Sequence, residues 1–148
     1  MKANRLFIAC VASLSLAACG GGTELTAVLS GAAEKPTAVT TNASGNADVT
    51  VDGTSIKATG SFKDLSGNAT AAHIHGPADA NSTAGVFCNL NVPAAPSGTI
   101  NEGTGAGSCG AMTLTDAQIK DFEDGKMYVN IHTGANPNGE IRGQLNKK

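Results

Sequence analysis

The chain has 148 residues and a formal net charge of −2 at pH 7. This balance argues against a nucleic-acid partner, because proteins that bind nucleic acids need a basic surface. Aromatic side chains make up only 3% of the residues, so the core of a single domain must be built mainly from Val, Ile, Leu and Ala.

Residues 1–18 have the pattern of a signal peptide. Lys2 and Arg5 precede an apolar stretch over residues 6–16, which is too short to cross a bilayer. Leu16-Ala17-Ala18-Cys19 resembles the lipobox of bacterial lipoproteins, which predicts cleavage before Cys19 and lipidation of its side chain. The alternative is an ordinary secretory signal in which Cys19 is an incidental thiol.

Cleavage at this point defines three segments. Residues 1–18 are the lipoprotein signal peptide, residues 19–24 are the lipidated Cys19 with a short Gly-rich tether, and residues 25–146 are the folded domain. The protein is then exported and anchored to the membrane of the cell envelope by its lipid. Gly20 rather than Asp follows Cys19, which favours the outer membrane if the cell is Gram-negative.

The four cysteines have different predicted roles. Cys10 leaves with the signal peptide and Cys19 carries the lipid. Cys88 and Cys109 remain as an even pair in an oxidising compartment, which predicts a disulfide bond between them. Closing that loop would stabilise the fold by about 3 kcal/mol. The alternative is a pair of separate buried thiols.

Apolar and polar residues alternate with a period of two along most of the domain, as is typical of half-buried strands. Strands are predicted over residues 24–29, 45–51, 55–62, 70–75, 86–92, 108–114, 126–132 and 140–145. Asp52-Gly53 predicts a hairpin turn. Two stretches rich in small and turn-forming residues, 32–44 and 93–107, are predicted to be loops.

One helix is predicted, over about residues 115–124. Thr115 and Gln118 match a capping box, Leu114 and Ile119 match a hydrophobic staple, and Gly125 ends the helix. Many short strands with a single small helix predict an all-β fold, an antiparallel Greek-key sandwich or barrel.

Three of the predicted strands carry polar side chains on one face. Residues i and i+2 point to the same side of a strand, so His73 and His75 point together and Ile74 points away. The same alternation applies to the last two strands. If these strands are neighbours, one continuous polar patch contains His73, His75, Tyr128, Asn130, His132, Glu140, Arg142 and Gln144.

Three interpretations of this patch stay open. His73, His75 and His132 could hold a transition metal, Cu or Zn, since neutral imidazoles suit both ions. The patch could instead be a structural hydrogen-bond network in which Glu140 pairs with Arg142 or another neighbour. It could also bind a small ligand or a protein partner. The residues considered for that role are Tyr128, Asn130, Glu140, Arg142 and Gln144.

No catalytic residue set is predicted. No serine lies in a Gly-x-Ser-x-Gly context, and the glycine-rich stretch 103–107 has no lysine for a phosphate. Glu140 beside His75 or His132 could supply acid–base chemistry. The His-x-His strand is weakly similar to that of copper/zinc superoxide dismutase, which needs more histidines than the three present here. We therefore expect a non-enzymatic protein, without superoxide dismutase-like or hydrolytic activity.

Four ordered sequence blocks resemble the CHRD (chordin) domain and together span nearly the whole predicted domain. They are Leu29-Ser30-Gly31-Ala32-Ala33-Glu34-Lys35-Pro36, Ala72-His73-Ile74-His75-Gly76-Pro77-Ala78, Gly125-Lys126-Met127-Tyr128-Val129-Asn130-Ile131-His132-Thr133 and Asn136-Pro137-Asn138-Gly139-Glu140-Ile141-Arg142-Gly143-Gln144-Leu145. The family usually has an acidic-Val-Pro sequence where this chain has Glu34-Lys35-Pro36.

The resemblance implies a fold unit more than an activity. CHRD domains occur in animal chordins, which antagonise bone morphogenetic proteins, and in many bacterial exported proteins, and the family supplies no catalytic residues to transfer. Together with the lipobox it leads us to expect a lipid-anchored, non-enzymatic binding or scaffold module at the cell envelope. The alternative is an envelope protein that binds Cu or Zn through its three histidines.

Overall fold

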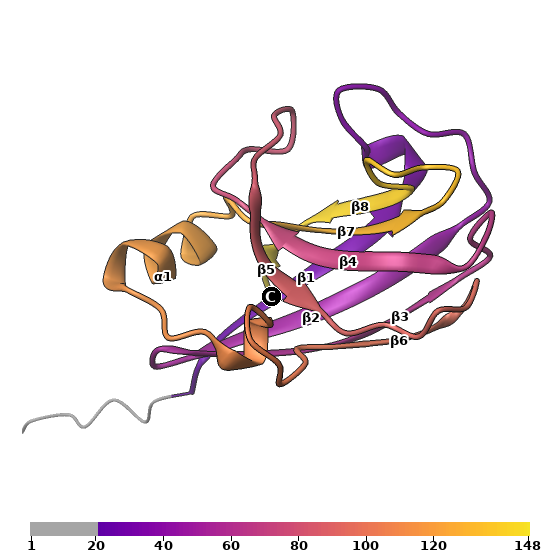
Figure 1. Ribbon diagram of the computed structural model, residues 1–148. Coiled ribbons are helices and arrows are strands. Elements are labelled where there is room, and N and C mark those ends of the chain that lie inside the picture. Colours follow the sequence, from indigo (N-terminus) through magenta and orange to yellow (C-terminus); the bar gives the residue numbers. More distant parts are fainter. Residues whose placement is uncertain (1–20) are drawn as a thin grey trace, which may run out of the picture.

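The computed structural model describes residues 21–148, so the predicted signal peptide and Cys19 lie outside the described part of the chain (Figure 1). Within residues 21–148, nine strands form one antiparallel sheet. They are β1 (Thr23–Ser30), β2 (Ser44–Asp52), β3 (Ser55–Lys63), β4 (Ala69–His75), β5 (Val86–Leu90), β6 (Gly98–Asn101), β7 (Tyr128–Thr133), β8 (Ile141–Gln144) and β9 (Asn146–Lys147). One α-helix, α1 (Asp116–Glu123), and two 3-10 turns, η1 (Gly31–Ala33) and η2 (Cys109–Ala111), complete the fold.

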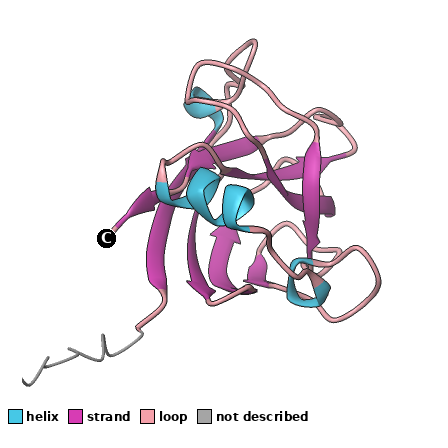
Figure 2. Cartoon of the chain, turned by 90° about the vertical axis from the view of Figure 1, so that its left-hand side faces the viewer, coloured by secondary structure: helices cyan, strands magenta, loops and turns pink. Residues whose placement is uncertain are grey.

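The sheet curls into a nearly closed barrel. Its strand order is β5-β4-β7-β8-β1-β2-β3-β6, and β9 adds to β1. The two ends of this order meet where Asn91, just after β5, exchanges backbone hydrogen bonds of 2.8 and 3.0 Å with Asn101 of β6. The predicted all-β, antiparallel architecture with one short helix is therefore confirmed, with the strands arranged around a common core (Figures 1 and 2).

Strand alternation decides which side chains enter the barrel. In the β2–β3 hairpin, the apolar residues Val49, Val51 and Ile56 are buried, while their polar neighbours face outward. Asp52 pairs with Ser55 across a two-residue turn in which Gly53 has a φ of +57°. That left-handed conformation suits glycine, which explains why Asp52-Gly53 marks the hairpin.

The helix begins and ends where the sequence predicts. Thr115 accepts a hydrogen bond from the Gln118 backbone N–H, and the Gln118 side chain accepts one from the Thr115 N–H, which completes the capping box. Phe122 is fully buried and meets Phe87 edge to face, so α1 closes one end of the barrel (Figure 2). Among the described residues, no helix is long and apolar enough to cross a membrane.

Two predictions about the segment 93–114 are wrong. The predicted loop 93–107 contains strand β6, which pairs with β3 and buries Ile100. A single buried apolar residue between polar ones is too short a pattern to reveal an edge strand. Within the predicted strand 108–114, residues Cys109–Ala111 form the 3-10 turn η2 instead, and Cys109 is bonded to Cys88.

The predicted disulfide bond joins Cys88 of β5 to Cys109 of η2, 21 residues apart. Both cysteines are buried in the core. The bond ties the edge strand β5 to a turn that packs against it, so it fixes the edge of the barrel next to β4.

We expect reduction of this disulfide to lower the free energy of unfolding by about 3 kcal/mol, since the unfolded chain regains the entropy of an open loop. The measurement is the urea midpoint of the protein purified under oxidising conditions, with and without dithiothreitol. A Cys88→Ala/Cys109→Ala variant serves as the control and should not respond to the reductant. An equal response of both proteins would contradict the assignment.

Candidate functional site

The register of β4, β7 and β8 places the predicted polar residues in rows on one face of the sheet. His73 pairs with Asn130, which pairs with Arg142 on its other side. His75 pairs with Tyr128, which pairs with Gln144. Residues paired across antiparallel strands share a face, and the opposite face of these strands carries core residues such as Ile74 and Ile131. The polar face is therefore the outer face of the barrel.

Loops cover this outer face, so the polar residues are largely buried. All six residues of β7 are buried. Arg142 donates hydrogen bonds from Nη2 to the carbonyls of Asp79 and Ser82, and Gln144 donates to the carbonyl of Ala78. These contacts hold the segment between β4 and β5 over the sheet. The polar face is thus an internal layer between sheet and loops.

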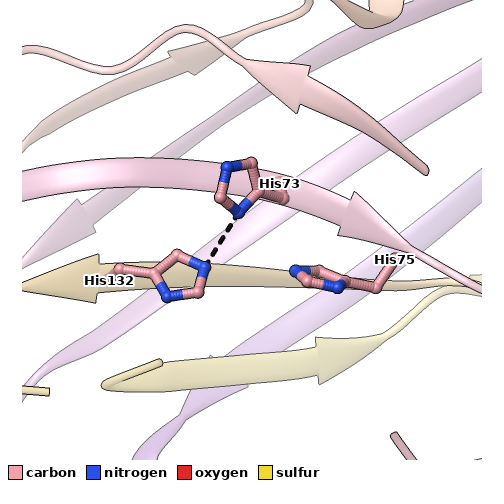
Figure 3. Close-up of side chains that lie close together, drawn as sticks. All are labelled: His73, His75 and His132. Atoms are coloured by element: carbon pink, nitrogen blue, oxygen red, sulfur yellow. Dashed lines mark hydrogen bonds between the residues drawn. The ribbon is translucent and has the colours of Figure 1, made fainter. Parts of the chain in front are cut away.

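The three histidines converge within this layer (Figure 3). Nδ1 of His73 lies 2.9 Å from Nε2 of His132. One nitrogen from each of His73, His75 and His132 can be chosen so that all three lie within 4.8 Å of one another. His75 and His132 are buried and His73 is half-buried, so the cluster reaches solvent through the His73 ring. Among the described residues, this is the group of metal-binding side chains that comes together.

Backbone carbonyls orient two of the three rings. Nδ1 of His132 lies 3.0 Å from the Pro137 carbonyl, and Nδ1 of His75 lies 3.1 Å from the Ala84 carbonyl. A carbonyl oxygen can only accept, so each Nδ1 carries the proton and each Nε2 keeps its lone pair. Metal-binding histidines in proteins are commonly held in this way, with the second nitrogen donating to a carbonyl.

All three imidazoles favour the neutral form. Burial lowers the pKa of His73 to about 4, with a further contribution from His132 and His75. Burial also lowers the pKa of His75 and of His132, although the carbonyls of Ala84 and Pro137 act in the opposite direction. Neutral imidazole is the form that binds metals.

One contact in the cluster is mismatched. The Nε2 of His75, which keeps its lone pair, faces Oδ1 of Asn130 at 3.1 Å. The Asn130 NH2 group donates to the Asn138 carbonyl at 3.3 Å. Turning the amide over would bring that NH2 group to His75, but the amide oxygen would then face the Asn138 carbonyl. A neutral His75 therefore leaves one acceptor facing another in either orientation.

Comparison with known proteins agrees with the sequence blocks described above. The family model of the CHRD domain matches residues 25–145, nearly the whole described chain. The chain belongs to the CHRD domain family. No curated protein and no solved structure matches it.

Glu140 does not join the histidines of the CHRD domain or pair with Arg142. Its fully buried carboxylate accepts hydrogen bonds from the side chains of Thr41, Ser66 and Thr133 at 2.8, 2.6 and 2.7 Å. The backbone N–H of Ser66 and the Asn136 amide also donate to it. Glu140 precedes β8 and links the loops at one end of the polar layer, so its role is structural.

Hydrogen bonding sets the charge of Glu140. Burial alone would raise its pKa, but the donors from Ser66, Thr133 and Thr41 outweigh burial and lower the pKa to about 2. A carboxylate whose pKa is lower in the folded state stabilises the fold fully above its unfolded pKa of about 4.5. This stabilisation is lost as the pH falls from there toward 2.

We expect Glu140→Gln to destabilise the domain by roughly 2–3 kcal/mol at pH 7, because several donors lose a charged acceptor. The difference from the wild type should shrink as the pH falls from 4.5 toward 2, where the native carboxylate becomes protonated. Urea unfolding over this pH range measures the effect. Glu123→Gln, the same change at an exposed site on α1, is the control. A difference independent of pH would refute this account.

Sequence reasoning missed one residue of the polar layer, Glu34. It follows η1 and is buried. Oε1 of Glu34 and Nδ2 of Asn130 each lie 2.5 Å from the position that a Cβ at Gly139 would occupy, so the two side chains are close together. Burial raises the pKa of Glu34 to about 7, although the Arg142 guanidinium opposes the change. One sequence feature could have identified Glu34. In Glu34-Lys35-Pro36 it occupies the position at which the family usually has an acidic residue.

Proposed function

We propose that this CHRD domain is a non-enzymatic binding module whose ligand is one Cu or Zn ion, held by His73, His75 and His132 at the cell envelope. The sequence leaves two functions open, a general scaffold and a metal-binding protein. The arrangement of the three histidines favours the metal-binding protein. The observation that carries the proposal is the convergence of three imidazole nitrogens to within 4.8 Å of one another.

The distances suit a metal after small side-chain movements. Bonds of about 2.0–2.1 Å in a tetrahedral site separate neighbouring nitrogens by about 3.3 Å. The 2.9 Å between His73 and His132 is slightly shorter than this, and the widest separation of 4.8 Å is longer. The rings of His75 and His132 are the most widely separated pair, with centres 6.1 Å apart, so these two rings must approach each other when a metal binds. An all-imidazole site favours Zn and Cu over the oxygen-seeking Mg and Ca.

A metal explains a feature that a network of neutral imidazoles does not. When all three imidazoles are neutral, the lone pair on Nε2 of His75 faces the acceptor Oδ1 of Asn130. Buried polar networks stabilise a fold only when each member is satisfied. A cation bound to the Nε2 atoms of His75 and His132 would occupy those lone pairs, while their Nδ1–H groups remain bonded to carbonyls.

The surroundings favour binding over catalysis. Three histidines with an open fourth position also occur in catalytic zinc sites, where a base or acid completes the chemistry. Glu140 is fully engaged by Thr41, Ser66 and Thr133, and Glu34 approaches the cluster only through Asn130. In the described part of the chain, no carboxylate joins the three histidines.

We expect the chelator-treated protein to bind one equivalent of Zn(II) or Cu(II) with a Kd below about 1 μM, and His132→Ala to weaken binding at least tenfold. The reason is that His132 is oriented by the Pro137 carbonyl and contributes a whole ligand. Isothermal titration calorimetry gives both stoichiometry and affinity.

The control is Glu34→Gln, which leaves the three imidazoles in place. His132→Ala also leaves every cysteine unchanged, so any metal held by a thiol is common to all proteins compared. Equal affinity in the wild type and in His132→Ala, or no binding tighter than micromolar, would contradict the proposal. Loss of folding in metal-free His75→Ala would favour the structural network instead.

We also propose that the domain is attached to the membrane through a lipid on Cys19. The support is the lipobox at the predicted cleavage point and the few residues between Cys19 and β1, which begins at Thr23. By random-coil dimensions of about 5–6 Å × √n, so short a tether keeps the domain within about 15 Å of the membrane surface.

We expect Cys19→Ala to abolish incorporation of a labelled fatty acid, measured in the purified protein. Cys10→Ala is the matched control, since Cys10 lies inside the predicted signal peptide, and it should leave labelling unchanged. Retained labelling in Cys19→Ala would rule out this anchor.

A further inference from the structure

A cavity lies in the same polar layer, beside the histidine cluster. Its volume is about 250 Å³, and its walls include Glu34, Arg142, Tyr128 and Asn130. His75 contributes to the same wall, whereas His73 and His132 do not line the cavity. The volume is below the roughly 300–1,000 Å³ of pockets that hold drug-sized ligands, so the cavity suits a molecule of about ten heavy atoms.

The acidic wall of the cavity has an unused acceptor. Glu34 is 3% exposed, and its Oε1 has no hydrogen-bond partner among residues 21–148. Leaving a buried carboxylate oxygen without a donor costs about 1–3 kcal/mol or more. Glu34 also lines the cavity, so a donor group of a ligand there would meet the acidic side of the site.

The basic wall has unused donors. Arg142 is 2% exposed, and its guanidinium lies 3.5 Å from the centre of the Tyr128 ring. Its hydrogen bonds, to the Asp79 and Ser82 carbonyls, both use Nη2. Nη1 and Nε therefore have no acceptor within the described chain, and a guanidinium can bind a carboxylate through two parallel N–H groups.

Glu34 and Arg142 face the same space without touching. They interact electrostatically, but no ion pair within 4.0 Å joins them in the described residues, where the ion pairs all lie at the surface. The Arg142 guanidinium and the Glu34 carboxyl group, with a gap between them, match a ligand that carries a carboxylate at one end and an ammonium group at the other, since an ammonium group favours the ionised form of Glu34.

We propose that this cavity binds a free amino acid, with the ligand carboxylate on Arg142 and the ligand ammonium group on Glu34. The Tyr128 ring supports the site by stacking on His75, with ring centres 4.9 Å apart and planes 4° apart, while it carries the Arg142 guanidinium. Thr83 is exposed and lines the cavity, so it marks the side open to solvent. The site goes beyond the proposed metal site and does not depend on it.

The test measures binding of each of the twenty amino acids to the chelator-treated protein by calorimetry and thermal shift. We expect at least one to bind with 1:1 stoichiometry at millimolar affinity or better. Acetate and methylamine, which each carry one of the two charges, should bind at least tenfold more weakly. Lactate and glycolate distinguish an ammonium from a hydroxyl group at Glu34, and tighter binding of these than of any amino acid would overturn the assignment.

Glu34→Gln should weaken amino-acid binding at least tenfold, whereas Glu123→Gln should not. Thr83→Trp gives a second route that leaves the buried residues intact, because the large ring would fill the open side of the cavity. Thr113→Trp, the same change at another exposed threonine, is its control. Binding that persists equally in Glu34→Gln and Thr83→Trp, or no binding of any amino acid below about 10 mM, would overturn the proposal.

The two proposals separate cleanly in these variants. His132→Ala should lose the metal and keep the amino acid, because His132 does not line the cavity. Glu34→Gln should keep the metal and lose the amino acid. If His132→Ala loses both ligands while remaining folded, the cavity is part of the metal site, and the separate amino-acid site is refuted.

Discussion

The position of β7 between β4 and β8 is the constraint on which the rest of the polar layer depends. Its pairing with β4 sets His73 and His75 beside Asn130 and Tyr128, and its pairing with β8 adds Arg142 and Gln144. Because alternate residues of a strand point to opposite faces, the same pairing that sends Val129 and Ile131 into the core sends the polar residues outward. A slip of one residue would exchange the two sets.

The sequence predicts much of this arrangement, for a physical reason. Alternation over β4 and β7 is strong because Ala72 and Ile74 lie on one face of β4 and Val129 and Ile131 on one face of β7. That pattern places the histidines of each strand on the opposite face, and the pairing of β4 with β7 then brings them together. The pattern does not reveal how deeply the polar side chains are buried. The loops that bury Arg142 and Gln144 act through backbone carbonyls such as those of Asp79 and Ala78, and carbonyl positions have no side-chain signature.

Contacts between distant segments account for what sequence reasoning misses. Strand alternation predicts Glu140 beside Arg142, yet its partners are Thr41 and Ser66, which come from separate loops. Glu34 lies in a loop without periodicity, and its approach to Asn130 depends on the close passage of backbone at Gly139. Strand β6 is likewise defined by its neighbour β3 rather than by its own composition.

The disulfide bond holds β5 in place beside the histidines of β4. Cys88 pairs with Ile74, between the two histidines of β4, and the Ala84 carbonyl that orients His75 lies just ahead of β5. The covalent bond therefore secures the strand on which the His75 side of the cluster rests. In a reducing cytoplasm that support is absent. Under the proposed export and metal binding, a copy still in the cytoplasm would hold its histidines more loosely, and tight metal capture would begin only after it leaves that compartment.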